Sequence, residues 1–137
     1  MTPGNFSLDT SFVLRLLVAQ PLDQYHLAFR FLQEQRASQG SLHVSDLVLA
    51  EAYFALQAFY QMPKADALAA IATFTRHSGV TTTPVARAAL ALPNLASAKP
   101  GFVDRLIHRT SHAVGHTLVT FEKAAKKLPA TVVLPTS

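Results

Sequence analysis

Short runs of apolar and β-branched residues alternate with longer segments of helical periodicity along the whole chain. A strand, a helix and a second strand form the crossover unit of a parallel sheet, so this alternation predicts an α/β fold. We expect a central, mostly parallel sheet of four to five strands flanked by helices. The expected strands are residues 6–8, 42–44, 80–83, 117–120 and 131–134, and the expected helices are residues 11–18, 24–35, 46–60, 65–76, 84–92, 102–114 and 122–128.

The composition restricts the class of protein. A chain of 137 residues, half of them apolar, is long enough to bury a core, so we expect one folded domain over residues 1–137. There is no cysteine, which excludes a disulfide framework and a thiolate metal site. The chain has no apolar stretch of membrane-spanning length, and residues 1–5 lack the pattern of a signal peptide. We therefore expect a cytoplasmic protein without a membrane partner.

Four of the eight acidic residues lie in or beside apolar segments, where solubility does not explain them. An ionised carboxylate taken out of water needs a partner. A hard divalent cation that neutralises several carboxylates at once is the simplest common partner. The pattern therefore predicts a metal-dependent enzyme that acts on phosphate esters. The candidate residues are Asp9, Glu51, Asp104 and Glu122.

The positions of these acids fit the expected fold. Asp9 follows the first strand and Glu122 follows the strand that ends near Thr120, so we expect both at one edge of the sheet. Glu51 lies in a helix that is apolar nearly all round, which predicts that its side chain is buried. The positions of two of these acids can also be explained without a metal. Asp9 is a good helix cap, and Asp104 in a first helical turn is favoured by the helix dipole.

The segments that carry these acids resemble the motifs of one family. Residues 9–14, Asp-Thr-Ser-Phe-Val-Leu, resemble the opening motif of PIN-domain nucleases. Residues 45–51, 102–107 and 118–123 resemble the second, third and fourth motifs, in the same order. The size of the chain is most similar to VapC-type toxins of toxin–antitoxin pairs. Position 122 departs from the family, whose fourth motif usually has Asp, so the longer Glu side chain would have to fold back to reach the same metal.

The resemblance implies a single PIN-like domain that hydrolyses RNA with Mg²⁺ or Mn²⁺, leaving a 5′-phosphate and a 3′-hydroxyl. It implies that all four acids hold the metal and that Ser11 and Thr120 orient ligands or waters. Basic residues near the site, such as Arg105 and Lys123, would position the RNA backbone.

The resemblance also implies partners. An antitoxin would place its C-terminal segment in the acidic groove, and the toxin would form a homodimer. The net charge of +4 and the lysines at 123, 126 and 127 suit a polyanionic substrate such as RNA. Candidates for a dimer interface, which burial in the core explains equally well, are Leu14, Leu17, Phe29, Phe54 and Tyr60.

Two alternative interpretations remain. His108, His112 and His116 are spaced by four, which on a straight helix is typical of a transition-metal site. We expect instead histidines that are solvated or near RNA, because Gly115 ends the helix before His116 and the first two point to different flanks. The second alternative is a non-catalytic PIN-like protein that binds RNA or a partner. Asp104→Asn separates it from a nuclease, which should lose cleavage and keep its fold.

Overall fold

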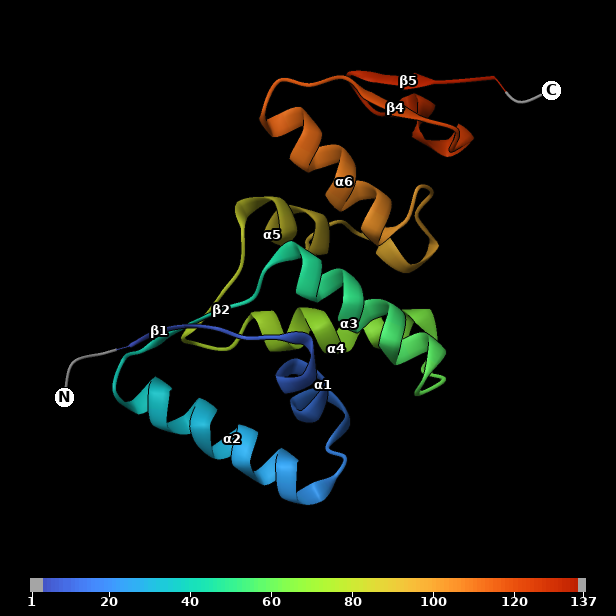
Figure 1. The fold of residues 1–137 in the computed structure, drawn as a ribbon. Helices are drawn as coiled ribbons and strands as arrows, with labels where there is room; N and C mark the ends of the chain where they lie inside the picture. The colour runs from blue at the N-terminus through green and yellow to red at the C-terminus, as the bar shows by residue number, and fades with distance from the viewer. Residues whose placement is uncertain (1–3, 136–137) are drawn as a thin grey trace. The chain divides into compact units, whose positions relative to one another are not determined.

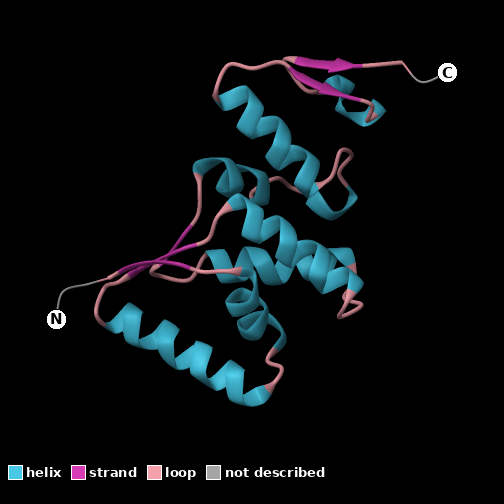
Figure 2. Ribbon diagram, viewed as in Figure 1, coloured by secondary structure: helices cyan, strands magenta, loops and turns pink. Residues whose placement is uncertain are grey.

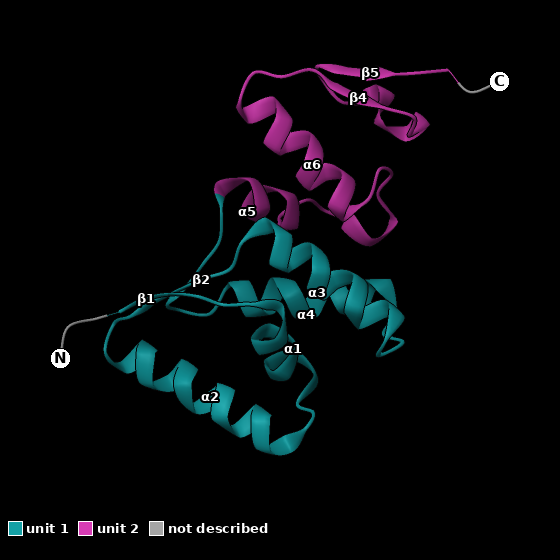
Figure 3. Ribbon diagram, in the orientation of Figure 1, with its two compact units in different colours: residues 1–83 teal, residues 84–137 magenta. Residues whose placement is uncertain are grey.

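The structure is a computed structural model that describes residues 4–135. The chain forms two compact units, residues 1–83 and residues 84–137, shown in different colours in Figure 3. Each unit has its own parallel sheet and its own helices (Figure 2). No helix within residues 4–135 has the length and apolar character needed to cross a bilayer.

The sheet of the first unit has three parallel strands in the order β1-β2-β3. The strands are β1 (Asn5–Ser7), β2 (Ser41–His43) and β3 (Val80–Thr81). Phe6 pairs with Leu42, which pairs with Val80. Since the strands are parallel, their carboxyl ends meet at one edge of this sheet, and the segments that follow them begin there.

Four helices complete the first unit, and local sequence signals explain where two of them begin. They are α1 (Thr10–Val18), α2 (Leu22–Ala37), α3 (Asp46–Ala58) and α4 (Lys64–Thr75) (Figure 1). Asp9 caps α1 through the Phe12 amide, and the Ser45 hydroxyl caps α3 by accepting from the Val48 amide at 3.2 Å. Helix α1 packs against α2, α3 and α4, while α2 contacts β2 and α4 contacts β3.

The core of the first unit is mainly aliphatic. Side chains from α1, β2, α3 and α4 are fully buried in it. Burying one such side chain contributes roughly 1.5–3 kcal/mol, so these contacts hold the helices against the sheet. The largest fully buried side chains of this unit are those of Val13, Leu42, Val44, Leu49, Leu56 and Ile71.

The turn into β3 depends on a glycine. Gly79 has φ +87°, and a Cβ there would lie 3.3 Å from Arg36 Cγ. L-residues with a side chain rarely adopt this φ. The Gly79 carbonyl accepts a 2.7 Å hydrogen bond from the Leu42 amide, and the Arg36 guanidinium donates to the Ser78 hydroxyl at 3.0 Å. The turn therefore connects α2, β2 and β3.

The second unit contains α5 (Pro84–Leu90), the 3₁₀ turn η1 (Leu95–Ser97), α6 (Phe102–Ala113), β4 (Leu118–Thr120), the 3₁₀ turn η2 (Lys123–Lys127) and β5 (Thr131–Val133). Strands β4 and β5 are parallel, with Leu118 opposite Thr131. Helix α6 packs against α5 and β4, and η2 packs against β5. Phe102 and Leu106 of α6 are buried.

The α/β class and the parallel strands are confirmed, and each expected strand and helix lies near its predicted position, except that the helix expected at residues 122–128 is the 3₁₀ turn η2. The five strands form two sheets, of three and of two strands, within residues 4–135. Asp9 and Glu122 therefore follow strands of different sheets, so the expectation that they share one sheet edge was wrong. The reason is that β4 pairs with β5 and not with the first three strands, which local periodicity does not reveal. That the chain is one PIN-like domain stays a prediction.

Candidate active site

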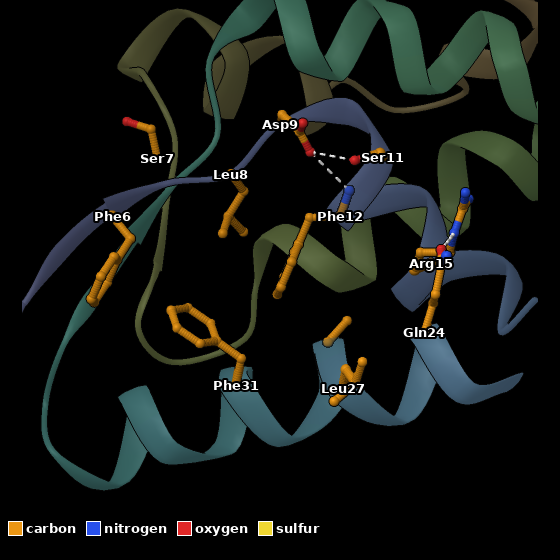
Figure 4. Close-up of a pocket in the computed structure, with 11 residues that line it drawn as sticks. Phe6, Ser7, Leu8, Asp9, Ser11, Phe12, Arg15, Gln24, Leu27 and Phe31 are labelled. Carbon is orange, nitrogen blue, oxygen red and sulfur yellow. Dashed lines mark hydrogen bonds between the residues drawn. The ribbon is translucent and has the colours of Figure 1, made fainter. Parts of the chain in front are cut away.

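Asp9 is the predicted site residue with the most defined geometry. It directly follows Leu8, whose amide continues the pairing of β1 by donating to the His43 carbonyl at 2.9 Å. Asp9 Oδ1 accepts hydrogen bonds from the Ser11 hydroxyl at 2.7 Å and from the Phe12 amide at 3.0 Å (Figure 4). Ser11 thus contacts the carboxylate that it was expected to orient.

These contacts also determine the charge of Asp9. The backbone hydrogen bond from Phe12, followed by the hydroxyl of Ser11, lowers the pKa of the Asp9 carboxyl below its ordinary value. The side chain is exposed to solvent. Asp9 is therefore an ionised, solvent-accessible carboxylate with a defined orientation at neutral pH, which is what a cation ligand requires.

Glu51 lies in the middle of α3, and its side chain is exposed, so the prediction of burial was wrong. Helix α3 buries only one face, and its other face leaves Leu47 70% and Phe54 55% exposed. The helix is apolar on both faces, but only one of them packs. The carboxylate of Glu51 therefore needs no buried partner, and the burial argument for a metal does not apply to it.

The surroundings of Glu51 still connect it to Asp9. Glu51 and Thr10, the residue that follows Asp9, line one cavity of about 450 Å³ between α3 and α1. The two helices pack against each other (Figure 1). The two predicted carboxylates of the first unit thus come from neighbouring elements.

The second unit holds the other two predicted acids. Asp104 is exposed in the first turn of α6. Glu122 is exposed and caps η2, its Oε1 accepting from the Ala124 amide at 3.1 Å. The Thr120 hydroxyl accepts from the Glu122 amide at 3.0 Å, so Thr120 holds the backbone at Glu122.

The first unit also contains an acid that the sequence analysis did not propose as a site residue. Asp46 follows β2, and its Oδ1 accepts a 2.6 Å hydrogen bond from the hydroxyl of Thr83, which follows β3. Both residues lie at the sheet edge where Asp9 follows β1. The signal in the sequence was the position of Asp46 just beyond an expected strand of a parallel sheet.

The two expected RNA-binding cations differ in their contacts. Arg105 Nε donates to the Pro100 carbonyl at 2.7 Å, and Nη2 reaches the Lys99 carbonyl at 3.5 Å. The guanidinium therefore holds the loop before α6, and binding a phosphate through Nε would compete with this contact. Lys123 is exposed at the start of η2.

The histidines of α6 correct two further predictions. His108 is buried, not solvated, and its Nε2 donates to the Pro129 carbonyl at 2.7 Å, since that oxygen can only accept. The rings of His108 and His112 stack with centroids 5.8 Å apart, so they lie on one flank of the helix. The physical reason is that residues four apart are neighbours on a helix surface. His116 lies beyond the helix and is exposed.

A family model described as PIN domain matches residues 7–130. This chain belongs to the PIN domain family. Comparison with curated proteins and with solved structures returned no match. PIN domains are generally nucleases, and the matched range includes both units and all four predicted carboxylates.

PIN domains commonly use divalent metal ions. The donors predicted here are carboxylate oxygens, which suit Mg²⁺ or Mn²⁺. Within residues 4–135, however, no three or more histidine, cysteine, aspartate or glutamate residues are grouped so that they could hold a metal ion. The four predicted ligands are divided between the units, two in each. The chemistry of the donors fits a hard cation, and their assembly into one metal site stays a prediction.

Proposed function

We propose that this PIN domain is a Mg²⁺- or Mn²⁺-dependent endoribonuclease and the toxin of a type II toxin–antitoxin pair. The observation that carries the proposal is Asp9, an ionised carboxylate held by Ser11 and the Phe12 amide at the start of the range that matches the family. In this proposal the ligands are Asp9, Glu51, Asp104 and Glu122.

The bound metal would supply an activated water and neutralise charge on the phosphodiester. The chain supplies two carboxylates that hydrogen bonds orient, those of Asp9 and Glu122. Two hydrogen bonds hold the Asp9 side chain in one orientation, so binding a cation costs little rotamer entropy there. Its lowered pKa means that no proton has to leave before the cation binds. Thr120 contributes by holding the backbone of Glu122.

RNA as the substrate is supported by charge. The chain carries twelve lysines and arginines against eight acids. Lys123, Lys126 and Lys127 are exposed along η2, directly after Glu122. A cluster of exposed cations next to a proposed catalytic acid favours a polyanionic substrate through its phosphates.

The toxin role and its partners rest on resemblance and on one surface feature. Helix α3 and its C-cap expose Leu47, Phe54 and Phe59, the last of them 82% exposed. Exposed aromatic and aliphatic residues of this size are typical of surfaces covered by another chain. We propose that a homodimer or an antitoxin covers them.

The deciding experiment is mapping of RNA 5′ ends in cells after induction of the wild type or of Asp9→Asn at matched protein levels. Asp66→Asn is the matched control, because Asp66 is also an exposed aspartate at the start of a helix, in the first turn of α4, and is not a proposed ligand. New 5′-phosphate ends with the wild type and Asp66→Asn, and none with Asp9→Asn, support the nuclease. Growth arrest with the same pattern supports the toxin.

A non-catalytic RNA-binding or partner-binding protein is the second candidate. The observation that favours it is that Asp9 and Glu122 both cap helices, which explains these acids without a metal. A folded wild type that yields no new ends and binds RNA as well as Asp9→Asn does would establish this alternative.

A further inference from the structure

A cavity of about 600 Å³ opens beside Asp9 within the first unit. Its walls come from β1, α1 and α2 (Figure 4). Asp9 and Ser11 belong to its lining, so the proposed catalytic carboxylate and the cavity share a wall. We call it the Asp9 pocket.

Three phenylalanines give the Asp9 pocket an aromatic surface. Phe31 of α2 lies edge-to-face with Phe6 of β1, with centroids 5.1 Å apart, and with Phe12 of α1, 5.9 Å apart. Both pairs have interplanar angles of 79°, so the rings do not stack on one another. Phe6 remains 37% exposed. The cluster therefore offers ring surface to a flat ligand.

The opposite end of the Asp9 pocket is polar. Arg15 Nε donates to Gln24 Oε1, and both side chains line the cavity (Figure 4). A guanidinium carries further N–H donors beyond Nε and a positive charge. The pocket thus combines an aromatic surface with a cation and a carboxylate at its rim.

We propose that the Asp9 pocket binds one unpaired base of a single-stranded RNA, next to the phosphodiester that is cut. The base stacks on the phenylalanines, and Arg15 contacts the adjoining phosphate or the edge of the base. This inference rests on the proposed function for the position of the cut. Only an unpaired base can enter the pocket, because the bases of a duplex are stacked inside it.

The polar end favours a base over an apolar peptide. An apolar segment that filled the cavity would cover Arg15 and Gln24 without offering them new partners, which costs free energy. A nucleotide carries donors, acceptors and a negative charge next to its flat ring, and so matches both ends. Stacking of one base on aromatic side chains changes affinity about 5- to 150-fold.

The first test measures binding without cleavage. The full chain with isotope-labelled phenylalanine is titrated with the four nucleoside 5′-monophosphates and, separately, with ribose 5-phosphate, which lacks a base. We expect the nucleotides to shift the resonances of Phe6, Phe12 and Phe31, and ribose 5-phosphate to leave them in place. Equal shifts with ribose 5-phosphate, or none with any nucleotide, would overturn the proposal.

The second test uses a fluorescein-labelled single-stranded RNA of random sequence and the Asp9→Asn chain, followed by anisotropy. Phe6→Leu and Phe31→Leu keep apolar volume and remove the ring, so each should weaken binding about 5- to 150-fold. Phe29→Leu is the matched control, since Phe29 lies on α2 outside the Asp9 pocket and stacks on Tyr25. Thermal unfolding of each variant confirms that it is folded.

The outcomes separate the two proposals. If folded Phe6→Leu and Phe31→Leu both bind the RNA with unchanged affinity, the base pocket is overturned, even if the wild type cleaves RNA. An apolar segment of a partner would then be the expected occupant of the cavity. Weakened binding with no cleavage by the wild type supports the pocket and contradicts the nuclease.

Discussion

Asp9 has a structural role and a proposed chemical role, and two substitutions separate them. Its Oδ1 accepts a hydrogen bond from the Phe12 amide at 3.0 Å, and this contact caps α1. Asn can accept the same hydrogen bond, and Ala cannot. Replacing an Asp cap with Ala costs about 1 kcal/mol, whereas Asn is about as good a cap as Asp. We therefore expect Asp9→Ala to lose about 1 kcal/mol of unfolding free energy.

The Asn variant keeps the cap and loses only the charge at the N-terminus of α1. That interaction contributes about 0.3–1 kcal/mol at most sites, and here it is at the low end because Asp9 is exposed. For a chain of this length, 1 kcal/mol corresponds to a shift in Tm of about 3 °C. Asp9→Asn should thus stay within about 1–2 °C of the wild type and still lose all cleavage.

The assay is urea and thermal unfolding followed by helical circular dichroism, because the chain has no tryptophan. Cleavage of RNA is measured on the same samples. If Asp9→Asn lowers the stability as much as Asp9→Ala does, then Asp9 does not stabilise the protein by capping α1. If Asn cleaves at the wild-type rate, Asp9 is not a metal ligand.

The pH dependence of the Asp9 contribution has a defined sign. Because the fold lowers the pKa of Asp9, the unfolded chain takes up the proton more readily. The stabilisation by its charge is therefore fully present above the ordinary pKa of an aspartate and is lost as the pH falls through the lowered pKa. The difference in unfolding free energy between the wild type and Asp9→Asn should therefore decrease to zero at acid pH. A difference that increases at acid pH would contradict this account.

Four further predictions concern other parts of the chain. His108→Phe should lower the free energy of unfolding by only about 1 kcal/mol, because the Pro129 carbonyl that loses the imidazole still accepts a hydrogen bond from the Thr131 hydroxyl. His112 is exposed, so His112→Phe should change the free energy of unfolding by no more than about 0.5 kcal/mol in urea unfolding. Gly79→Ala should lower the free energy of unfolding by about 1 kcal/mol or more in the same measurement, since φ is +87° there. An unchanged stability would contradict the positive φ at Gly79. Chelation with EDTA should abolish cleavage and Mg²⁺ or Mn²⁺ should restore it, whereas restoration by Zn²⁺ alone would argue against oxygen ligands. Glu122→Asp should keep cleavage and Glu122→Gln should lose it in a kinetic assay, and full activity of Glu122→Gln would remove this residue from the proposed ligands.

Local sequence signals were sufficient for most of the element boundaries. The Ser45 cap of α3 and the Gly79 turn into β3 each act through hydrogen bonds or dihedral preferences that span only a few residues. The same holds for Asp9, whose contacts with Ser11 and Phe12 lie within one helical turn. These features follow from neighbouring residues, so a single sequence is enough to predict them.

The errors have a different physical origin. Glu51 was expected to be buried because both faces of α3 are apolar, yet only a packing partner decides which face loses its water. His108 is buried because its ring reaches the Pro129 carbonyl, twenty-one positions away, which no periodicity encodes. The division of the strands into two sheets is likewise a matter of long-range pairing.

The sequence by itself thus determined the order of strands and helices, the cap at Asp9, and the membership of the PIN domain family, because each depends on local pattern. Only the tertiary structure decided which apolar face is covered, and it alone brought Phe6, Phe31 and Arg15 from three elements to one pocket beside Asp9. Side chains so far apart in the chain meet only when the burial of a shared core offsets the entropy lost in bringing them together.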